Sequence, residues 1–498
     1  MNIVRLKPVP VFGLVLALLS LILTGCADPT RQVIGKPYLV DSPTPETIFG
    51  EATIGPNASK EAIQNIKAPP LPHKGPLTLD ECLEIAQRVS PSIDTAQQGY
   101  VGALWGRWSA ITDFLPAVSM SYRVTHQGDL ANTPGHGSGR EQYAWGTTVS
   151  QPVFMGGRNV ANYLLAQLGV SQADITKIQA REDLLLAVKQ AYFSILATEK
   201  ALNVARTTVV NLTSHLSVAQ NFFEVGMVPR NQVLEAEVEL AKAQQEETTQ
   251  GRNLVVNKAR LNILLRQAVD ANIRVTDELK YYKFPLTLDF CMNIGLNDNP
   301  EIRLAKTQVE SGAKNVDVAR SQLYPQVELV YNNSSTGNTG RASGGWGPNP
   351  SSWTVAAVAS INVWEWGKTK AAVEQSKVAL NQAINNLTSL EDNTKLEITS
   401  NYQSLISAGR NIDVSAKAVE SAAEDLRMVT ERYQEQVATN TDVLDAQTRY
   451  SSAQYEHYQA LYNYNLAWAA IERSLGRRVP AQGLPDRPAR RPTPQDNR

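Results

Sequence analysis

The chain has 498 residues, and its 47 basic residues are balanced by 48 acidic ones. This balance excludes a broad electrostatic attraction to nucleic acid, so no nucleic-acid partner is expected. The five histidines are scattered without metal-ligand spacing, and no phosphate-binding glycine loop or hydrolase motif is present. We therefore predict neither an enzyme nor a protein that carries a metal or another cofactor.

Residues 1–25 have the features of a lipoprotein signal peptide. A basic start is followed by an apolar run, Val11–Leu23, which is too short to span a bilayer comfortably. Small residues then precede Cys26, as in bacterial lipoprotein cleavage sites, so we expect a covalent lipid on Cys26. The alternative is an ordinary secretory signal with an incidental cysteine. Residues 26–76, rich in Pro, Thr and Gly, predict an extended tether behind the lipid.

The sequence repeats itself with an offset of 209 to 210 residues. Leu77-Thr78-Leu79-Asp80, for example, matches Leu286-Thr287-Leu288-Asp289. Further matches follow in the same order, which predicts a tandem duplication with copies at 77–282 and 283–478. The Pro- and Arg-rich residues 479–498 predict a disordered tail.

Each copy contains one very long helix with a coiled-coil pattern. The apolar residues that recur every seven positions are Val188, Ile195, Leu202, Val209, Leu216 and Phe223, and then Ile398, Leu405, Ile412, Val419, Leu426 and Tyr433. A strict seven-residue period predicts left-handed coiling of paired helices.

The predicted helices of each copy have lengths that fit one another. They are expected at 93–113, 158–225 and 231–266, and again at 302–322, 368–436 and in a returning helix that ends near 476. A long helix would reach about 100 Å, and two shorter ones placed end to end would reach about 85 Å. We therefore expect one long helix to lie beside two shorter helices in series.

Two segments with a period of two precede each long helix. Their apolar sides are Val118, Met120, Tyr122 and Val124; Tyr143, Trp145, Thr147 and Val149; Val327, Leu329 and Tyr331; and Trp353, Val355, Ala357, Ala359, Ile361 and Val363. Strands of about ten residues with one apolar face are typical of a membrane barrel wall. The alternative is a soluble four-stranded sheet with one buried face.

Four strands cannot close a barrel in a membrane, because lipid tolerates no open sheet edge and the smallest bacterial barrels have about eight strands. Two copies of the chain would give eight strands, a size that side chains fill. Three copies would give twelve strands and a passage. We therefore predict a mainly α fold with a membrane β-barrel portion, built of long coiled-coil hairpins, with four strands per protomer in a trimeric twelve-stranded barrel.

The duplicated order of helix, helix, strand, strand, long helix, hairpin and helix resembles the TolC family of outer-membrane factors. The resemblance covers Leu77 to about Arg478, and its most specific match is Thr441-Asp442-Val443-Leu444-Asp445-Ala446. Cys26 resembles the lipid-anchor site of the lipoprotein subset. The resemblance implies a homotrimer in the outer membrane, with a helical tunnel in the periplasm. It also implies a periplasmic adaptor, or membrane fusion protein, at the hairpin ends and an inner-membrane pump.

These observations predict an outer-membrane exit duct of a tripartite efflux system, which passively exports small molecules that a pump delivers. The cell would be of Gram-negative type, with the helical part of the duct in the periplasm. A type I protein-secretion outlet is the alternative within the same class. From a different class, the alternative is a periplasmic coiled-coil scaffold lipoprotein without a pore.

Asp442 and Asp445 are the candidates for a cation-selective periplasmic gate. They lie three residues apart and share a helix face, so a threefold assembly would place up to six carboxylates near its inner end. The alternative is that Asp442 caps the returning helix and Asp445 complements its dipole. The resemblance implies an arginine shortly before the first aspartate, but Ala438 stands there; Arg230 or Arg449 are the candidate substitutes.

The two hairpin turns are the candidates for contact with the adaptor. Their residues are Gly226, Met227, Val228 and Pro229, and Val437, Ala438, Thr439 and Asn440. The alternative is a plain helix-hairpin turn, for which Gly and Pro need no further cause. Gln436 replaces the glycine that symmetry with Gly226 predicts, so we expect the two turns to differ in shape. Cys82 and Cys291, at matching positions, are expected to be packing thiols rather than a disulfide.

Overall fold

The structure is a computed structural model, and it describes residues 75–127, 140–337, 339–340, 342 and 351–480. All of these residues belong to one compact unit. The predicted signal peptide, Cys26, nearly all of the predicted tether and residues 481–498 lie outside the described residues.

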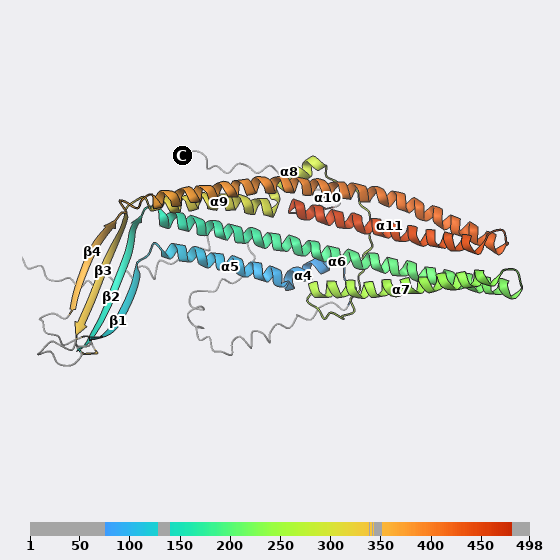
Figure 1. The fold of residues 1–498 in the computed structure, drawn as a ribbon, viewed down its shortest axis with the longest axis horizontal. Coiled ribbons are helices and arrows are strands. Elements are labelled where there is room, and N and C mark those ends of the chain that lie inside the picture. The colour runs from blue at the N-terminus through green and yellow to red at the C-terminus, as the bar shows by residue number, and fades with distance from the viewer. Residues whose placement is uncertain (1–74, 128–139, 338, 341, 343–350, 481–498) are drawn as a thin grey trace, which may run out of the picture. The chain divides into compact units, whose positions relative to one another are not determined.

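The described chain consists of two copies of one series of elements (Figure 1). The first copy contains α4 (Leu79–Val89), α5 (Pro91–Thr112), β1 (Ala117–Gln127), β2 (Arg140–Met155), α6 (Arg158–Glu224) and α7 (Arg230–Leu264). The second contains α8 (Leu288–Asp298), α9 (Pro300–Ser321), β3 (Gln326–Gly337), β4 (Ser351–Ser360), α10 (Lys368–Gln434) and α11 (Asn440–Leu475). Both long helices have 67 residues and are 210 residues apart at both ends, so the predicted duplication is confirmed.

Local chemistry explains where the shorter helices begin. Thr78 caps α4 through a reciprocal capping box with Glu81, and the Asn299 side chain accepts hydrogen bonds from the backbone of Glu301 and Ile302 at the start of α9. α5 and α9 each begin with a proline, whose fixed φ suits the first helical position.

The four strands form one antiparallel sheet in the order β1-β2-β3-β4. β1 and β2 pair Val118 with Val149, and β3 and β4 pair the equivalent Val327 with Ala359. Apolar residues of the sheet stand in the open, with Val118 62% and Met120 78% exposed. β1 and β4 are the two edges of the sheet, and the backbone groups on their outer sides have no partner strand in the described residues.

The fourth strand is shorter than predicted. The alternating pattern continues to Val363, but β4 ends at Ser360. Ser360 pairs with Gln326, the first residue of β3, so residues beyond Ser360 have no neighbouring strand in the part of the chain that the structure describes.

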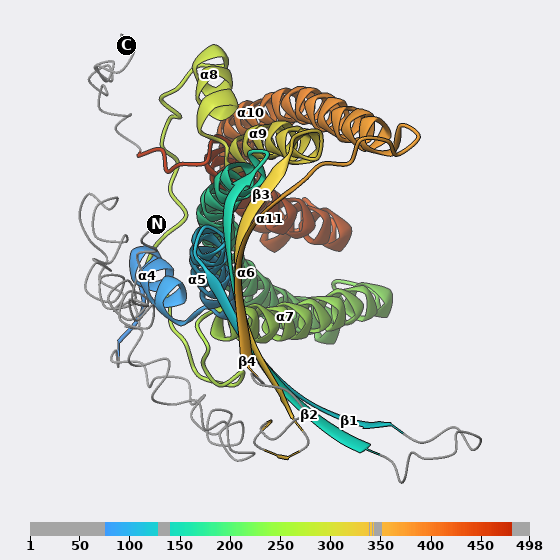
Figure 2. The same ribbon diagram turned by 90° about the vertical axis from the view of Figure 1, so that its left-hand side faces the viewer.

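Each long helix lies beside two shorter helices in series, as the lengths predicted (Figure 1). α5 and α7 pack along α6, and α9 and α11 pack along α10. The opposite side of α6 also packs against α9 and α11, so α6 lies between both pairs of short helices (Figure 2). α10 and the pair α5 and α7 therefore form the two outer sides of this helix array.

The heptad positions in the middle of the long helices form the core. Val188, Ile195, Ile398 and Leu405 are fully buried. The heptad positions are no longer buried at the end of α6, where Phe223 is 42% exposed although the equivalent Tyr433 of α10 is only 3% exposed. Tyr433 is covered by the rings of His215 and Phe222 from the other hairpin, whereas Phe223 lies at the open end of its own helix.

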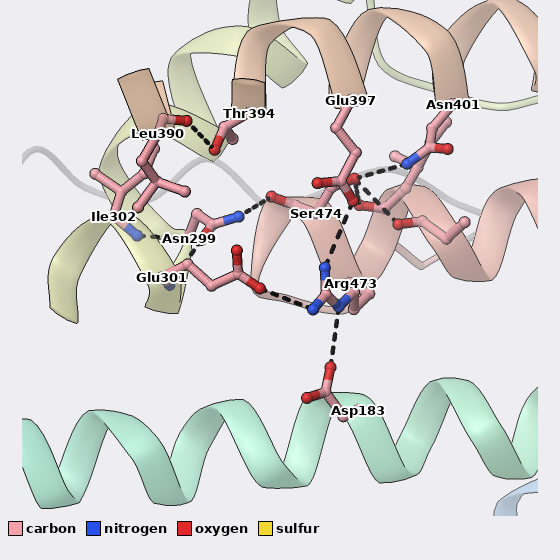
Figure 3. A network of polar contacts seen from close by, with 12 residues as sticks. Asp183, Asn299, Glu301, Ile302, Leu390, Thr394, Glu397, Asn401, Arg473 and Ser474 are labelled. Carbon is pink, nitrogen blue, oxygen red and sulfur yellow. Dashed lines mark hydrogen bonds and ion pairs between the residues drawn. The ribbon is translucent and has the colours of Figure 1, made fainter. Parts of the chain in front are cut away.

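Polar contacts join the two copies where α11 ends (Figure 3). Arg473 of α11 pairs with Asp183 of α6 at 3.0 Å and with Glu301 of α9 at 2.8 Å. The next residue towards the start of the helix, Glu472, forms a buried ion pair with Lys189 of α6. These contacts attach the last turn of the second copy to the long helix of the first.

The boundary of the predicted tail is off by a residue or two. Val479 was expected to begin a disordered segment, but it is buried, and its backbone nitrogen donates to Glu472 Oε1 at 2.7 Å. Cys82 and Cys291 are free, buried thiols, as predicted, and burial raises their pKa values to about 12 and about 11. Among the described helices, none is both long and apolar enough to cross a membrane.

Candidate pore entrance at the helix tips

The two hairpin turns have the same backbone conformation, contrary to the prediction from their sequences. Gly226 has φ +76° and Gln436 has φ +63°, both in the left-handed region. Their nitrogens donate equivalently, to Phe223 and to Tyr433 respectively, each at 3.0 Å. A glycine usually takes this position at a helix end. Gln436 adopts it at a conformational cost, because the hydrogen bonds that end α10 require it.

The exposed surface of the turns is mostly apolar. We call it the tip surface, and its residues are Val225, Gly226, Met227, Val228, Pro229, Val437, Ala438 and Thr439. Val225, Met227 and Val437 are 67%, 58% and 72% exposed. The two turns meet, because Gln436 Nε2 lies 2.8 Å from Met227 Sδ. They thus form one continuous end, which is mostly apolar and in which Gln436 joins the two turns.

Asn440, predicted to contact the adaptor, lies elsewhere. Its side chain is only 1% exposed and joins the two hairpins. Its Oδ1 lies 2.7 Å from His215 Nε2, and its Nδ2 donates to the Gln232 carbonyl and to Glu235 Oε2, each at 3.2 Å. We therefore leave Asn440 out of the tip surface, because in this conformation its polar atoms are occupied within the chain.

An aromatic cluster surrounds this buried contact. The His215 ring lies 5.0 Å from the Tyr433 ring, which is 5.7 Å from that of Phe222. Burial lowers the pKa of His215, so the imidazole is held neutral near pH 7. Reading the sequence alone missed this cluster. The sequence signal available was that His215 and Asn440 both lie near predicted hairpin turns, where the ends of the long helices are expected to come together.

Asp442 and Asp445 are both exposed on the first turns of α11. Thr439 is the N-cap, and the Asp442 carboxylate accepts from its backbone nitrogen at 2.8 Å and from its hydroxyl at 2.7 Å. These hydrogen bonds lower the pKa of Asp442. Asp442 is therefore part of a capping box, so it helps to cap the returning helix, as the alternative interpretation proposed. Its second carboxylate oxygen remains available to solvent.

The two candidate arginines differ. Arg449 pairs with Asp425 of α10 at 3.0 Å, within its own hairpin. Arg230 is the exposed first residue of α7, and it forms no ion pair with another described residue. The described residues likewise contain no cluster of acidic, His and Cys side chains able to hold a metal ion.

Comparison with known proteins places this geometry in a family. The model of the outer membrane efflux protein family matches residues 85–265 and 293–477, which is one block in each copy. The chain belongs to the outer membrane efflux protein family. Membership places it in the outer membrane and confirms the resemblance that the duplicated pattern predicted.

Curated relatives include two kinds of transport component. The chain is 23% identical to the alkaline protease secretion protein AprF of Pseudomonas aeruginosa over 376 residues, covering 72% of this chain and 76% of the relative. It is 21% identical to the probable efflux pump outer membrane protein SepC of Pseudomonas putida, covering 73% of this chain and 75% of that one.

Solved structures show the same fold. The outer membrane protein VceC of Vibrio cholerae superposes with a TM-score of 0.70 at 17% identity, covering 80% of this chain and 96% of VceC. The MtrE outer membrane channel of Neisseria gonorrhoeae superposes with a TM-score of 0.69 at 19% identity, covering 80% and 89%. The predicted fold, long helical hairpins with a four-stranded barrel portion, is confirmed.

Proposed function

We propose that this efflux-family protein is a homotrimeric exit duct in the outer membrane. It would release small molecules that an inner-membrane pump delivers through a periplasmic adaptor, with its tip surface against the adaptor. A lipid on Cys26 would anchor the chain to the same membrane. Transport of this kind requires no catalytic residue in the duct, because the pump supplies the energy.

The observation that carries the proposal is that both the sheet and the helix array have sides without a neighbour. In the sheet, β1 and β4 are open edges with apolar residues such as Met120 in the open. In the helix array, α6 has short helices on both sides, but α10 has them on one side only. By the repeat, the helices that α10 lacks on its other side correspond to α5 and α7 of a second copy of the chain, just as α6 packs against α9 and α11.

Such complementary open sides join head to tail, and a head-to-tail contact that closes forms a ring. Three protomers with four strands each give twelve strands, enough for a passage, whereas eight strands would be filled by side chains. The apolar sheet face would then meet lipid, and no sheet edge would remain open.

Two measurements test the proposal. The purified lipoprotein is expected to migrate as a heat-resistant trimer on denaturing gels and to conduct ions in planar lipid bilayers. A protein that stays monomeric in detergent and in lipid, with no conductance, would instead favour the scaffold alternative.

A type I protein-secretion outlet is the second candidate, and the match to AprF, named for alkaline protease secretion, favours it. Both functions use the same duct, so the chain's own residues do not separate them. Deletion of the gene separates them: an efflux duct is expected to leave cells sensitive to toxic small molecules with an unchanged secretome. Loss of one secreted protein with unchanged tolerance would favour the secretion outlet.

A further inference from the structure

The repeat provides a rule for deriving the contacts between protomers. Adding 210 to a residue of the first hairpin gives its equivalent in the second, and this holds at the tips: α7 begins at Arg230 and α11 at Asn440. The turns before them share their main hydrogen bonds, donated by Gly226 and Met227 in the first turn and by Gln436 and Val437 in the second. The sheet keeps its register when β1 is shifted by 209 residues onto β3 and β2 by 210 onto β4. Near the tips, positions that meet between the first hairpin and the second therefore have equivalents that meet between the second hairpin and the first hairpin of the next protomer.

The contact within the chain centres on Asn440. Its side chain enters from the second hairpin and meets three groups of the first: the His215 ring, the Glu235 carboxylate and the Gln232 carbonyl. Because Asn440 is the first residue of α11, this contact fixes the position of the start of that helix against its neighbours.

The equivalent contact between protomers has opposite charges on its two sides. Asn440 becomes Arg230 of the next protomer, while His215 and Glu235 become Asp425 and Asp445. We propose that Arg230 of each protomer enters a carboxylate site formed by Asp425 and Asp445 of its neighbour, and that this ion-pair contact holds the periplasmic end of the ring together. The proposal rests on the trimer proposed above.

The sizes of the residues match as well as their charges. Within the chain a long His meets a short Asn; between protomers a short Asp meets a long Arg, so the total reach is similar. Arg230 and Asp445 are exposed in the single chain and form no ion pair with each other or with another described residue. Asp425 already pairs with Arg449, but a carboxylate has two oxygens and can accept from two guanidinium groups.

This assignment changes the expected role of Asp445. A ring of free carboxylates would bind cations, whereas a carboxylate paired with Arg230 of the neighbouring protomer contributes to closure of the entrance instead. The contact within the chain is buried and uncharged on one partner, but the contact between chains is ionic. At the tips, salt is therefore expected to weaken the contact between protomers more than the contact within the chain.

Cross-linking tests the geometry. Arg230→Cys combined with Asp425→Cys, treated in native membranes with the short thiol cross-linker dibromobimane, is expected to give covalent dimers and trimers on reducing gels. His215→Cys with Asn440→Cys is the matched control, because its link forms within one chain and leaves the monomer mass unchanged. The parent, with its native cysteines, is expected to give no cross-linked band.

The outcomes separate this inference from the proposed function. Heat-resistant trimers without covalent oligomers would overturn the contact and leave the trimer intact. Loss of the trimer in the parent itself would overturn both.

Charge reversal tests the role of the contact. Arg230→Asp is expected to raise the resting conductance of the duct several-fold in planar bilayers, and Arg230→Asp with Asp445→Arg is expected to return it towards the parent value. Each variant is first checked for heat-resistant trimers. An Arg230→Asp trimer with parental conductance, or a double variant no closer to the parent than the single one, would overturn the proposal.

Discussion

Asp442 shows how one carboxylate takes part in two interactions at the start of a helix. One oxygen accepts both hydrogen bonds from Thr439, and those bonds keep the group ionised by lowering its pKa. An ionised carboxylate near a helix N-terminus also complements the helix dipole. Capping and cation binding are thus compatible, because capping holds the negative charge in place without covering it.

The first prediction concerns divalent cations at the tips. Asp442→Ala removes from each protomer a solvent-facing carboxylate that is not assigned to the pair with Arg230, so we expect weaker block of single-channel current by divalent ions. Asp442→Asn, which removes charge while keeping an oxygen for Thr439, controls for loss of the cap. The same block in Asp442→Ala as in the parent would contradict a role of Asp442 in cation binding.

His215 makes the hairpin contact sensitive to pH. Burial lowers its pKa in the folded protein, while the unfolded chain has the ordinary value near 6.5. The unfolded state therefore takes up the proton first as the pH falls, and stability is lost below about pH 6.5 until the folded-state pKa is reached. Asn440 and Tyr433 face the ring, and neither carries a charge that would offset an added proton.

We expect the parent to lose thermal stability between pH 6.5 and pH 5.5 by more than a His215→Gln variant does. Circular dichroism melting curves of the detergent-solubilised protein at both pH values measure this difference. Equal losses in the two proteins would show that other groups determine the acid sensitivity.

At the scale of elements, two turns of different sequence have one shape because the helices around them require it. Gln436 adopts a left-handed conformation that costs an L-residue about 1 kcal/mol relative to glycine. Sequence alone predicted different shapes, since a glycine signals this conformation and a glutamine does not. The second turn has the shape of the first because the backbone nitrogens of Gln436 and Val437 donate to carbonyls in the last turn of α10.

Gln436→Gly is therefore expected to stabilise the second turn. Tryptic cleavage after Arg432 requires the last turn of α10 to open, and we expect it to slow by about fivefold. Gly226→Ala is the converse control, because it places a side chain at a left-handed position where a Cβ meets no atom within 4 Å. Any loss of stability in that variant is therefore due to backbone conformation alone. Faster cleavage in Gln436→Gly would show that the Met227 contact of the glutamine matters more than its strain.

Within the described residues, the second copy's ion-paired joint at the end of α11 has no counterpart at the end of α7. Arg473 and Glu472 connect the second copy to the first, but their equivalents in the first copy are Ile263 and Asn262. Asn262 instead donates to the carbonyls of Val269 and Ala271 in its own copy. In the proposed trimer, these equivalent positions therefore provide no matching ion pairs between protomers.

Removing one partner of the buried pair is expected to be costly. Lys189→Met leaves Glu472 buried without its cation, which costs about 3–5 kcal/mol. Adding Glu472→Gln restores neutrality and keeps an oxygen for the Val479 nitrogen, so most of the loss should be recovered. Melting temperatures of the parent, single and double variants test this, and a double variant as unstable as the single one would contradict it.

At the scale of the whole molecule, the repeat predicts the pairing of strands between protomers. Within the chain Val149 pairs with Tyr331. Adding 210 to Val149 and subtracting 209 from Tyr331 pairs Ala359 of β4 with Tyr122 of the neighbouring β1. Residues beyond Ser360 would then extend β4 along that strand. This would explain why an alternating pattern continues where the single chain has no partner.

The register can be tested by disulfides. Ala359→Cys with Tyr122→Cys is expected to give dimers and trimers on non-reducing gels, because opposed residues in antiparallel strands lie within disulfide range. Ala357→Cys with Met120→Cys, four residues out of the derived register, is the control and should give none. Cross-linking of the control pair alone would show a different register.

The sequence by itself determined the elements and their duplication, because a period of seven or two, a proline or a capping threonine acts on its near neighbours in the chain. It also placed Asp442 and Asp445 on one face of one helix. Only the tertiary structure decided that Asn440 is buried, that Gln436 turns like a glycine and that β4 ends at Ser360. Each of these depends on contacts that hydrogen bonding or packing creates only after the chain has folded back on itself.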